Sequence, residues 1–159
     1  MNNETKDQCC KEFNPDSLDG KEINLNGRKF LKKRYACFFH VPINIGQVMK
    51  QTCAIASEAQ AMPEDALWLC DENSPWGADL YLEINKDLPG QITSSLDGIY
   101  LCKIFDGPYK EMPKWIEEMK EFVEKKGKKT DKILAYYTTC PKCSKKYGHN
   151  YVGLLAKIS

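Results

Sequence analysis

Residues 97–127 read DGIYLCKIFDGPYKEMPKWIEEMKEFVEKKG, and this stretch decides the fold. Its first part, DGIYLCKIFDGPY, has the composition of a strand that ends in a Gly-Pro turn. From Pro108 onward, apolar residues recur at helical spacing until Gly127, a residue type that commonly ends helices. The stretch therefore predicts a strand followed by a helix over Pro108–Lys126. The apolar side of this helix carries Met112, Ile116, Met119 and Val123.

The same order of elements occurs earlier in the chain. KFLKKRYACFFHVP (29–42) has the composition of a strand, and residues 44–62 have helical periodicity, with Asn44 as a suitable N-cap. ALWLCDE (66–72) and ADLYLEIN (78–85) then predict two short strands. After the second helix, KILAYYTTC (132–140) and NYVGLLAKIS (150–159) predict two more. Strand-helix-strand-strand therefore occurs twice, with about 65 residues between corresponding points.

The duplication predicts an α+β fold with pseudo-two-fold symmetry, antiparallel sheets and two long helices. Residues 1–27 show turn residues without a sustained period, which indicates an irregular lead-in. The domain then covers residues 28–159, with one repeat over about 28–90 and the other over about 91–159. Ligand clefts commonly form where two such units meet, so the seam between the repeats is the expected place for a binding groove.

Charge and hydropathy exclude two classes of protein. Lys and Arg (23) nearly balance Asp and Glu (22), which gives a net charge of +1, whereas general nucleic-acid binders carry a basic excess. No apolar run approaches the ~18 residues of a membrane span, and the N-terminus lacks the features of a secretion signal. We therefore expect a cytoplasmic protein with reduced cysteines and neither a nucleic-acid nor a membrane partner. The cysteines inside apolar segments, which we expect to be small core residues, are Cys37, Cys53, Cys70 and Cys102.

The stretch KIFDGPYKEMPKWIEEMKEFVEKKG (103–127) resembles the second repeat of GyrI-like small-molecule-binding proteins. The resemblance covers roughly residues 28–159, and DENSPW (71–76), ADLYL (78–82), YYTTCPKCSKKYGHNYV (136–152) and Cys9-Cys10 are similar to one standalone branch. The family implies multidrug or effector binding, and the standalone branch implies detoxification by hydrolysis of cyclopropane-bearing DNA-alkylating compounds. The chain lacks the DNA-binding helices of the family's regulators. The strand AYYTTC (135–140) also lacks the Glu that many members carry there.

Aromatic residues on the predicted strands are the candidate ligand-binding groups. Alternation places Leu80, Leu82 and Ile84 on one side of their strand, toward the helices, and Tyr81 and Glu83 on the other. We expect Trp68, Tyr81 and Tyr136 to converge on one groove, with Trp76 on a neighbouring loop. Such rings would bind planar, hydrophobic or cationic ligands by stacking and cation–π attraction. The alternative is that the rings are ordinary core residues.

Glu83 is the candidate catalytic carboxylate, because enclosure by aromatic side chains would remove water and make it a usable base near neutral pH. Tyr109 of Gly107-Pro108-Tyr109 is a further candidate for the ligand site. On simpler interpretations Glu83 is surface charge, while Pro108 starts the helix and Tyr109 packs beneath it. The leading hypothesis is a small-molecule-binding protein. The second is a hydrolase in which Glu83 activates water and Tyr136 or Tyr109 hydrogen-bonds the developing negative charge.

The remaining cysteines allow a third hypothesis, a zinc- or thiol-dependent interaction protein. Cys140-Pro-Lys-Cys143 has the spacing of a zinc knuckle, and Cys9 and Cys10 would complete four ligands. Four protein ligands leave no open position, so such a zinc would be structural, holding the lead-in against the second repeat. A redox-active thiol pair and simple packing are the alternatives. No cofactor is required by the leading hypothesis.

Overall fold

The computed structural model describes residues 14–39, 41–63, 66–137, 145 and 148–158. Strand-helix-strand-strand occurs twice in it, as predicted. The first repeat consists of β2 (Lys29–Phe38), α2 (Ile45–Glu58), β4 (Trp68–Ser74) and β5 (Gly77–Ile84). The second consists of β7 (Ile99–Asp106), α3 (Met112–Lys125), β8 (Ile133–Tyr137) and β9 (Tyr151–Lys157). The two helices thus begin at residues 45 and 112, close to the predicted separation of about 65 residues.

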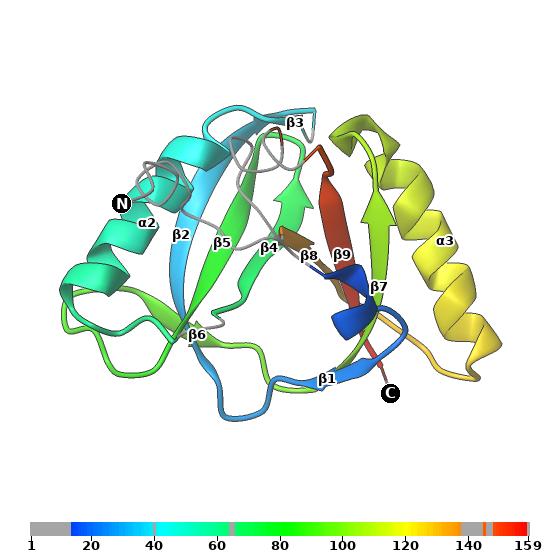
Figure 1. The fold of residues 1–159 in the computed structure, drawn as a ribbon, viewed down its shortest axis with the longest axis horizontal. Helices are drawn as coiled ribbons and strands as arrows, with labels where there is room; N and C mark the ends of the chain where they lie inside the picture. The colour runs from blue at the N-terminus through cyan, green and yellow to red at the C-terminus, as the bar shows by residue number, and fades with distance from the viewer. Residues whose placement is uncertain (1–13, 40, 64–65, 138–144, 146–147, 159) are drawn as a thin grey trace.

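The strands form an antiparallel sheet in which the two repeats meet at the centre. The order is β1-β7-β9-β8-β4-β5-β2-β3, so β4 of the first repeat pairs with β8 of the second. The registered pairs at this junction are Leu69 with Tyr136 and Cys70 with Ala135. In Figure 1, α2 lies at the left of the strands, beside β2, and α3 lies at the right, beside β7. The predicted α+β fold is confirmed.

Three short strands complete the sheet: β1 (Glu22–Asn24), β3 (Val41–Pro42) and β6 (Thr93–Ser95). β1 precedes the first repeat in sequence but pairs with β7 of the second. β6 precedes the second repeat but pairs with β2 of the first. The prediction that residues 1–27 are irregular is therefore wrong for the strand β1, whose three residues are too few to show periodicity. Ile23 and Leu25 from this segment are buried.

Apolar side chains fill both faces of the sheet. The face that carries α2 and α3, called the helix face below, includes Tyr35, Cys70, Leu80, Ala135 and Leu154. The face turned the other way, called the inner face, includes Phe30, Leu69, Tyr81, Tyr100, Leu134 and Leu155. Leu80 packs in the helix-face cluster, while Leu82 and Ile84 pack with Ala56 of α2. The predicted orientation of these three residues toward the helices is confirmed.

The helix ends differ from the predicted ones for local reasons. Asn44 is the N-cap residue of α2, but its Oδ1 accepts a hydrogen bond from the Ala36 N–H (2.7 Å) and caps no helical N–H. α2 ends at Glu58, before the predicted Met62, because Gln60 takes a positive φ of 52°. A 3₁₀ turn, Tyr109–Glu111, precedes α3, which begins at Met112 and has Pro113 in its first turn. Neither described helix has the length and hydrophobicity needed to cross a membrane.

Candidate functional site

The strand register separates the aromatic residues that were predicted to converge. Leu69 of β4 pairs with Tyr81 on one side and with Tyr136 on the other, so these three side chains share the inner face. Trp68 precedes Leu69 on β4 and therefore points to the helix face. There it packs against the helix-face cluster and against the neighbouring cluster that contains Leu82, Ile84 and Ala56. The prediction that Trp68 joins Tyr81 and Tyr136 in one groove is wrong.

Tyr81 and Tyr136 are packed on the inner face. Tyr81 is buried among apolar residues. The Phe30 ring lies edge-on to the Tyr81 ring, with 6.4 Å between the ring centres, and the Lys32 ammonium lies 5.9 Å from the centre of the Tyr81 ring. Burial, with the nearby Asp79 and Asp71 charges, raises the pKa of the Tyr81 phenol to about 12. Tyr136 packs beside Gly153 of β9, the residue with which it pairs. Both rings therefore belong to the apolar packing of this face.

The predicted base, Glu83, is also on the inner face and is held by two neighbours. One carboxylate oxygen accepts a hydrogen bond from the Leu67 N–H (3.2 Å), and the other lies 3.5 Å from an Arg28 guanidinium nitrogen. The Glu83 side chain is 14% exposed, against 40% for Arg28. Both contacts tie β5 to the segments beside it, which is a structural function. The catalytic role of Glu83 stays a prediction.

Trp76 lies at the turn between β4 and β5 and is 58% exposed. Its ring contacts Phe38 and Phe39, at centroid distances of 6.1 and 5.1 Å. Trp76 is thus part of an exposed aromatic cluster at one end of the sheet, apart from the other predicted site residues in the core. Tyr109 lies in the 3₁₀ turn before α3, and its side chain is outside the described part of the structure.

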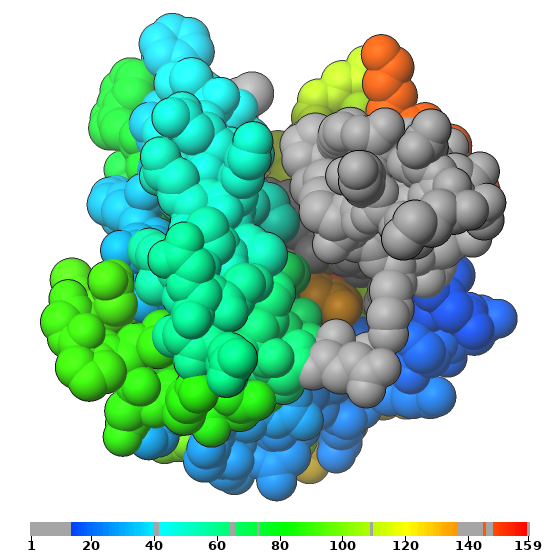
Figure 2. Space-filling model, turned by 60° about the vertical axis from the view of Figure 1, so that its left-hand side comes forward, coloured from blue at the N-terminus to red at the C-terminus, as the bar shows by residue number. Residues whose placement is uncertain are grey.

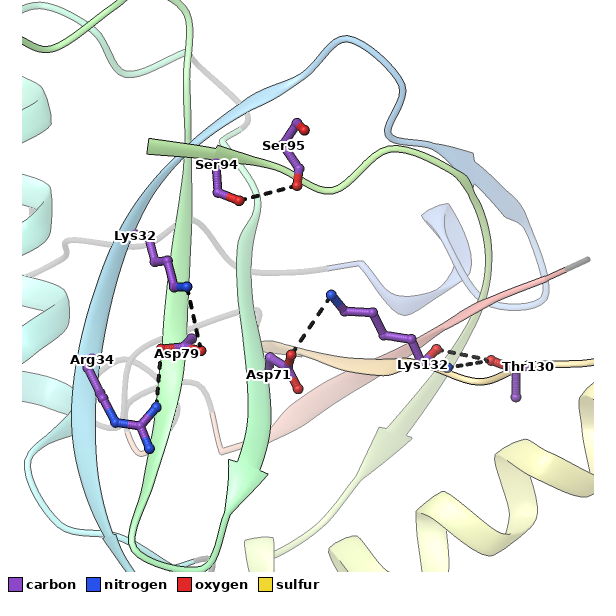
Figure 3. A network of polar contacts seen from close by, with 8 residues as sticks. All are labelled: Lys32, Arg34, Asp71, Asp79, Ser94, Ser95, Thr130 and Lys132. Atoms are coloured by element: carbon purple, nitrogen blue, oxygen red, sulfur yellow. Dashed lines mark hydrogen bonds and ion pairs between the residues drawn. The ribbon is translucent and has the colours of Figure 1, made fainter. Parts of the chain in front are cut away.

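A polar network covers part of the inner face (Figure 3). Asp71 and Asp79 are directly paired across β4 and β5. Asp79 lies 3.2 Å from the Arg34 guanidinium and 3.9 Å from the Lys32 ammonium, and Asp71 lies 3.9 Å from the Lys132 ammonium. Cations therefore offset the repulsion between the two carboxylates. This balance indicates a structural network, since partly exposed ion pairs mainly set local geometry.

The helix face at the seam carries a different set of polar groups. Tyr35 of β2 is 2% exposed, and Cys70 of β4 is completely buried. Glu72 follows Cys70 by two residues on β4, where the register with β5 shifts between Asp71 and Ser74, and its charge acts on both Tyr35 and Cys70. Burial raises the pKa of the Tyr35 phenol, and Cys70 and Glu72 raise it further. Burial likewise raises the pKa of the Cys70 thiol, with Glu72 adding to the effect although the bond to Tyr35 opposes it.

The Tyr35 hydroxyl is the distinctive group of this set. Among the described residues, it is the buried side-chain oxygen that lacks a conventional hydrogen-bond partner. The Cys70 thiol is close enough to affect it, but thiols are weak donors and acceptors. Leaving such a group without a full partner costs about 1–3 kcal/mol. A buried hydroxyl kept at this cost needs an explanation, and a bound ligand is one.

Tyr35 and Cys70 belong to an apolar cluster to which both repeats contribute side chains. The apolar helix-face residues come from α2, from α3 and from strands of each repeat; they include Met49, Leu80, Phe105, Trp115, Met119, Val152 and Leu154. The space-filling view shows a notch at one end of the molecule, between the β2–β3 end of the first repeat (cyan) and the second repeat (lime and orange) (Figure 2). The seam therefore combines an apolar wall with the hydroxyl of Tyr35, the thiol of Cys70 and the carboxylate of Glu72.

The sequence contains a signal for this set, although the prediction did not use it. Tyr35 and Cys37 alternate along β2, and Trp68, Cys70 and Glu72 alternate along β4. A polar side chain that alternates with apolar ones along one face of a strand is a candidate for a buried polar group. Cys37, Cys70 and Cys102 are buried, so the prediction that they are core residues is confirmed. Cys53, which was predicted to be a core residue as well, is only half-buried.

Cys9, Cys10, Cys140 and Cys143 lie outside the described residues. The zinc hypothesis and the thiol-pair hypothesis for them therefore stay predictions. Within the described part of the chain, no group of three His, Cys, Asp or Glu side chains could hold a metal ion.

The duplicated fold with its buried seam defines the class of the protein, an α+β protein of GyrI-like architecture. A family model described as bacterial hydrolase matches residues 1–158. The chain belongs to this bacterial hydrolase family. No curated protein sequence matches it.

Two solved structures align with this chain over most of its length. SAV2435, solved bound to tetraphenylphosphonium, superposes with a TM-score of 0.52 at 12% identity, over 89% of this chain and 94% of that chain. A Staphylococcus aureus MU50 protein described as a candidate for transcription regulation gives a TM-score of 0.49 at 13% identity, over 89% of this chain and 99% of that chain. At 12% identity, the similarity to SAV2435 shows the fold alone.

Proposed function

We propose that this protein binds a small, largely apolar molecule on the helix face, at the seam between the two repeats. The observation that carries the proposal is the buried Tyr35 hydroxyl, which lacks a conventional partner among the described residues and lies near Glu72. Ligand sites combine apolar walls with a few convergent polar groups, and this seam has both. A ligand with a hydrogen-bond acceptor would give the hydroxyl its partner.

Tetraphenylphosphonium, an aromatic cation without a hydrogen-bond acceptor, probes the apolar wall and the carboxylate of this site but not the Tyr35 hydroxyl. SAV2435, which shares the fold, was solved with this aromatic cation. An apolar wall with one carboxylate favours such a ligand, because the rings bury apolar surface and the carboxylate attracts the positive charge. In this proposal Glu72 attracts the charge, while Trp68 and its helix-face neighbours contact the rings.

The test is a matched pair of substitutions, Glu72→Gln and Glu83→Gln, with binding measured by calorimetry. Both variants remove one negative charge and keep the side-chain size, but they lie on opposite faces of the sheet. We expect Glu72→Gln to weaken tetraphenylphosphonium binding about fivefold, or roughly 1 kcal/mol, and Glu83→Gln to leave it unchanged. The reverse result would move the site to the inner face, and no binding by the unaltered protein would reject the proposal for this ligand.

The second candidate function is hydrolysis, which the family description favours. On the resemblance to standalone GyrI-like proteins, we propose strained cyclopropane rings as the substrate for this function. In that reaction a water oxygen bonds to one ring carbon while a ring C–C bond breaks. The electron pair moves to a conjugated oxygen, which takes up a proton. We propose Glu72 as the base that activates the water and Tyr35 as the donor to the developing oxyanion, with Glu83, Tyr136 and Tyr109 as the alternative set.

Turnover distinguishes the two functions. The protein is incubated with a cyclopropane-bearing DNA-alkylating compound, and the product is sought by mass spectrometry as the substrate plus one water. If the hydrolase hypothesis is correct, product forms; its loss in Glu72→Gln assigns the base to Glu72, and its loss in Glu83→Gln assigns the base to Glu83. Saturable binding without product would leave the binding function and reject hydrolysis.

A further inference from the structure

The C-terminal half of α2 and the segment that follows it bring together three side chains with sulfur or oxygen donor atoms. Cys53 and Ser57 are four residues apart on α2 and so lie on the same side of the helix. The Cys53 Sγ is 3.8 Å from the Ser57 Oγ and 3.9 Å from the Met62 Sδ. The Ser57 Oγ is 4.0 Å from the same Met62 sulfur. The three donor atoms thus form an almost equilateral triangle.

The backbone after α2 fixes the position of Met62. Gln60 has a positive φ of 52°, which turns the chain back at the helix end. The Ala61 N–H then donates to the Ala56 carbonyl (2.9 Å), and the Ala61 carbonyl accepts from the Asn85 N–H (2.8 Å). Ala56 and Ala61 are both completely buried. Met62 therefore leaves a fixed segment, and its approach to Cys53 does not depend on a flexible terminus.

The donor set suits a soft monovalent cation. A point equidistant from the three atoms lies about 2.3 Å from each, equal to the length of a typical metal–thiolate bond of ~2.3 Å. Thiolate and thioether donors select Cu(I) among biological metals, and a hydroxyl adds a weak third ligand. We propose that Cys53, Met62 and Ser57 form a binding site for Cu(I).

Accessibility separates Cys53 from the other described cysteines. Cys37, Cys70 and Cys102 are buried, and burial raises the pKa of each thiol, to about 12 for Cys102. These thiols keep their protons and are closed to an ion in solution. Cys53 and Met62 are half-buried and Ser57 is exposed, so an ion can reach all three donors and displace the Cys53 proton.

The test uses Ag(I) as a redox-stable substitute for Cu(I) and the methionine methyl groups as reporters. The full chain, labelled with ¹³C at the methyl groups of its five methionines, is titrated with Ag(I) under reducing-agent-free, anaerobic conditions. We expect the Met62 methyl resonance, assigned by its loss in Met62→Leu, to shift and saturate. Mg²⁺, which prefers oxygen ligands, should leave it unchanged.

Cys53→Ala decides whether the shift reports this site. In that variant the Met62 methyl should no longer move with Ag(I), whereas Ser57→Ala should weaken the response without abolishing it. Methyl reporters are needed because any other thiol of the chain can bind a soft ion, so the total amount of bound ion does not identify the site. A Met62 signal that stays still in the unaltered chain, or that shifts equally in Cys53→Ala, would overturn the proposal and leave three side chains in ordinary packing contact.

Discussion

At the residue scale, Tyr35 links stability to ligand binding. Its ring belongs to the helix-face core, but its hydroxyl has no conventional partner among the described residues. A core selected only for stability would have Phe at this position, because the ring packs equally well without the desolvated oxygen. The hydroxyl is thus the group at the seam that packing does not explain.

Tyr35→Phe should therefore raise the free energy of unfolding by about 1 kcal/mol, since removal of a poorly satisfied buried hydroxyl recovers its desolvation cost. Urea unfolding followed by circular dichroism measures the change. Tyr100→Phe, which removes a hydroxyl from the buried inner face, is the comparison. If Tyr35→Phe instead destabilises the protein, the bond between Tyr35 and Cys70 is stronger than a thiol normally provides.

Gly153 provides a second test of packing at single-residue resolution. A Cβ at this position would lie 3.1 Å from the Ile104 Cδ1 and 3.1 Å from the Tyr136 Cδ1. The Tyr136 Cβ would be 3.2 Å away, and it cannot move without the strand. Gly153→Ala should thus destabilise the protein by about 1–3 kcal/mol.

Gly46 is the matched control, since it lies in α2 and a Cβ there would meet no atom within 4 Å. Gly46→Ala should stabilise by up to about 1 kcal/mol, as expected for alanine in a helix. Urea denaturation of both variants measures the two changes in the free energy of unfolding, which should have opposite signs. A neutral Gly153→Ala would show that Tyr136 is free to shift, which would favour its proposed role in a ligand site.

At the element scale, β5 has buried residues on both faces, and this explains why the sequence prediction of the site failed. Alternation correctly separated Leu80 and Leu82 from Tyr81. It does not relate the faces of one strand to those of the next, because that relation depends on register. When both faces are apolar, hydrophobicity does not supply the missing register. Trp68 was therefore assigned to the wrong partners.

Tyr81→Ala and Trp76→Ala should differ sharply in their effects on folding. Tyr81 is 5% exposed in the inner-face core, so its truncation should cost about 3 kcal/mol or more. Trp76 is 58% exposed, so Trp76→Ala should change stability by less than about 1 kcal/mol. Thermal unfolding of the two variants checks this. Similar midpoints would contradict the burial of Tyr81, and weaker binding of a flat aromatic ligand by Trp76→Ala alone would place that ligand at the exposed cluster.

The sequence predicts long elements better than short ones. Both helices and most strands of the repeats have enough residues to show their period, and the duplication was visible in their order. β1 and β6 have three residues each, and their partners are more than sixty residues away along the chain. Their pairing is determined by the closure of the whole sheet, which local pattern does not contain.

At the scale of the whole molecule, the buried thiols and phenols predict an alkaline limit to stability. The pKa of Cys102 rises from 9.0 to about 12, and that of Tyr81 from 10.0 to about 12, in both cases mainly through burial. A raised folded-state pKa means that the folded protein holds the proton more tightly. The stabilisation is therefore complete below the unfolded pKa values and is lost as the pH rises through the folded ones.

Urea midpoints should accordingly stay constant up to about pH 9 and fall between pH 9 and pH 12. Tyr81→Phe should make the decline shallower above pH 10, because it removes one group that titrates there. A midpoint that is independent of pH over this range would show that Cys102 and Tyr81 ionise equally in both states.

Metal content is the remaining test at this scale. If Cys9, Cys10, Cys140 and Cys143 hold a structural zinc, protein purified under reducing conditions should contain about one zinc ion per chain. Elemental analysis, with a Cys140→Ser and Cys143→Ser double variant as control, decides this. Absence of zinc together with four freely titratable thiols would leave the thiol-pair and packing hypotheses.

The pairing of β1 with β7 and of β6 with β2 has a consequence for the independence of the two repeats. Each three-residue strand precedes one repeat in sequence and completes the other in space. The Leu25 N–H also donates to the Gly98 carbonyl (3.0 Å), so the two exchanged segments contact each other. Reciprocal exchange of equivalent segments is the defining feature of a domain-swapped dimer. The present chain has the form of such a dimer within a single chain, so neither repeat contains all the strands that complete its own part of the sheet.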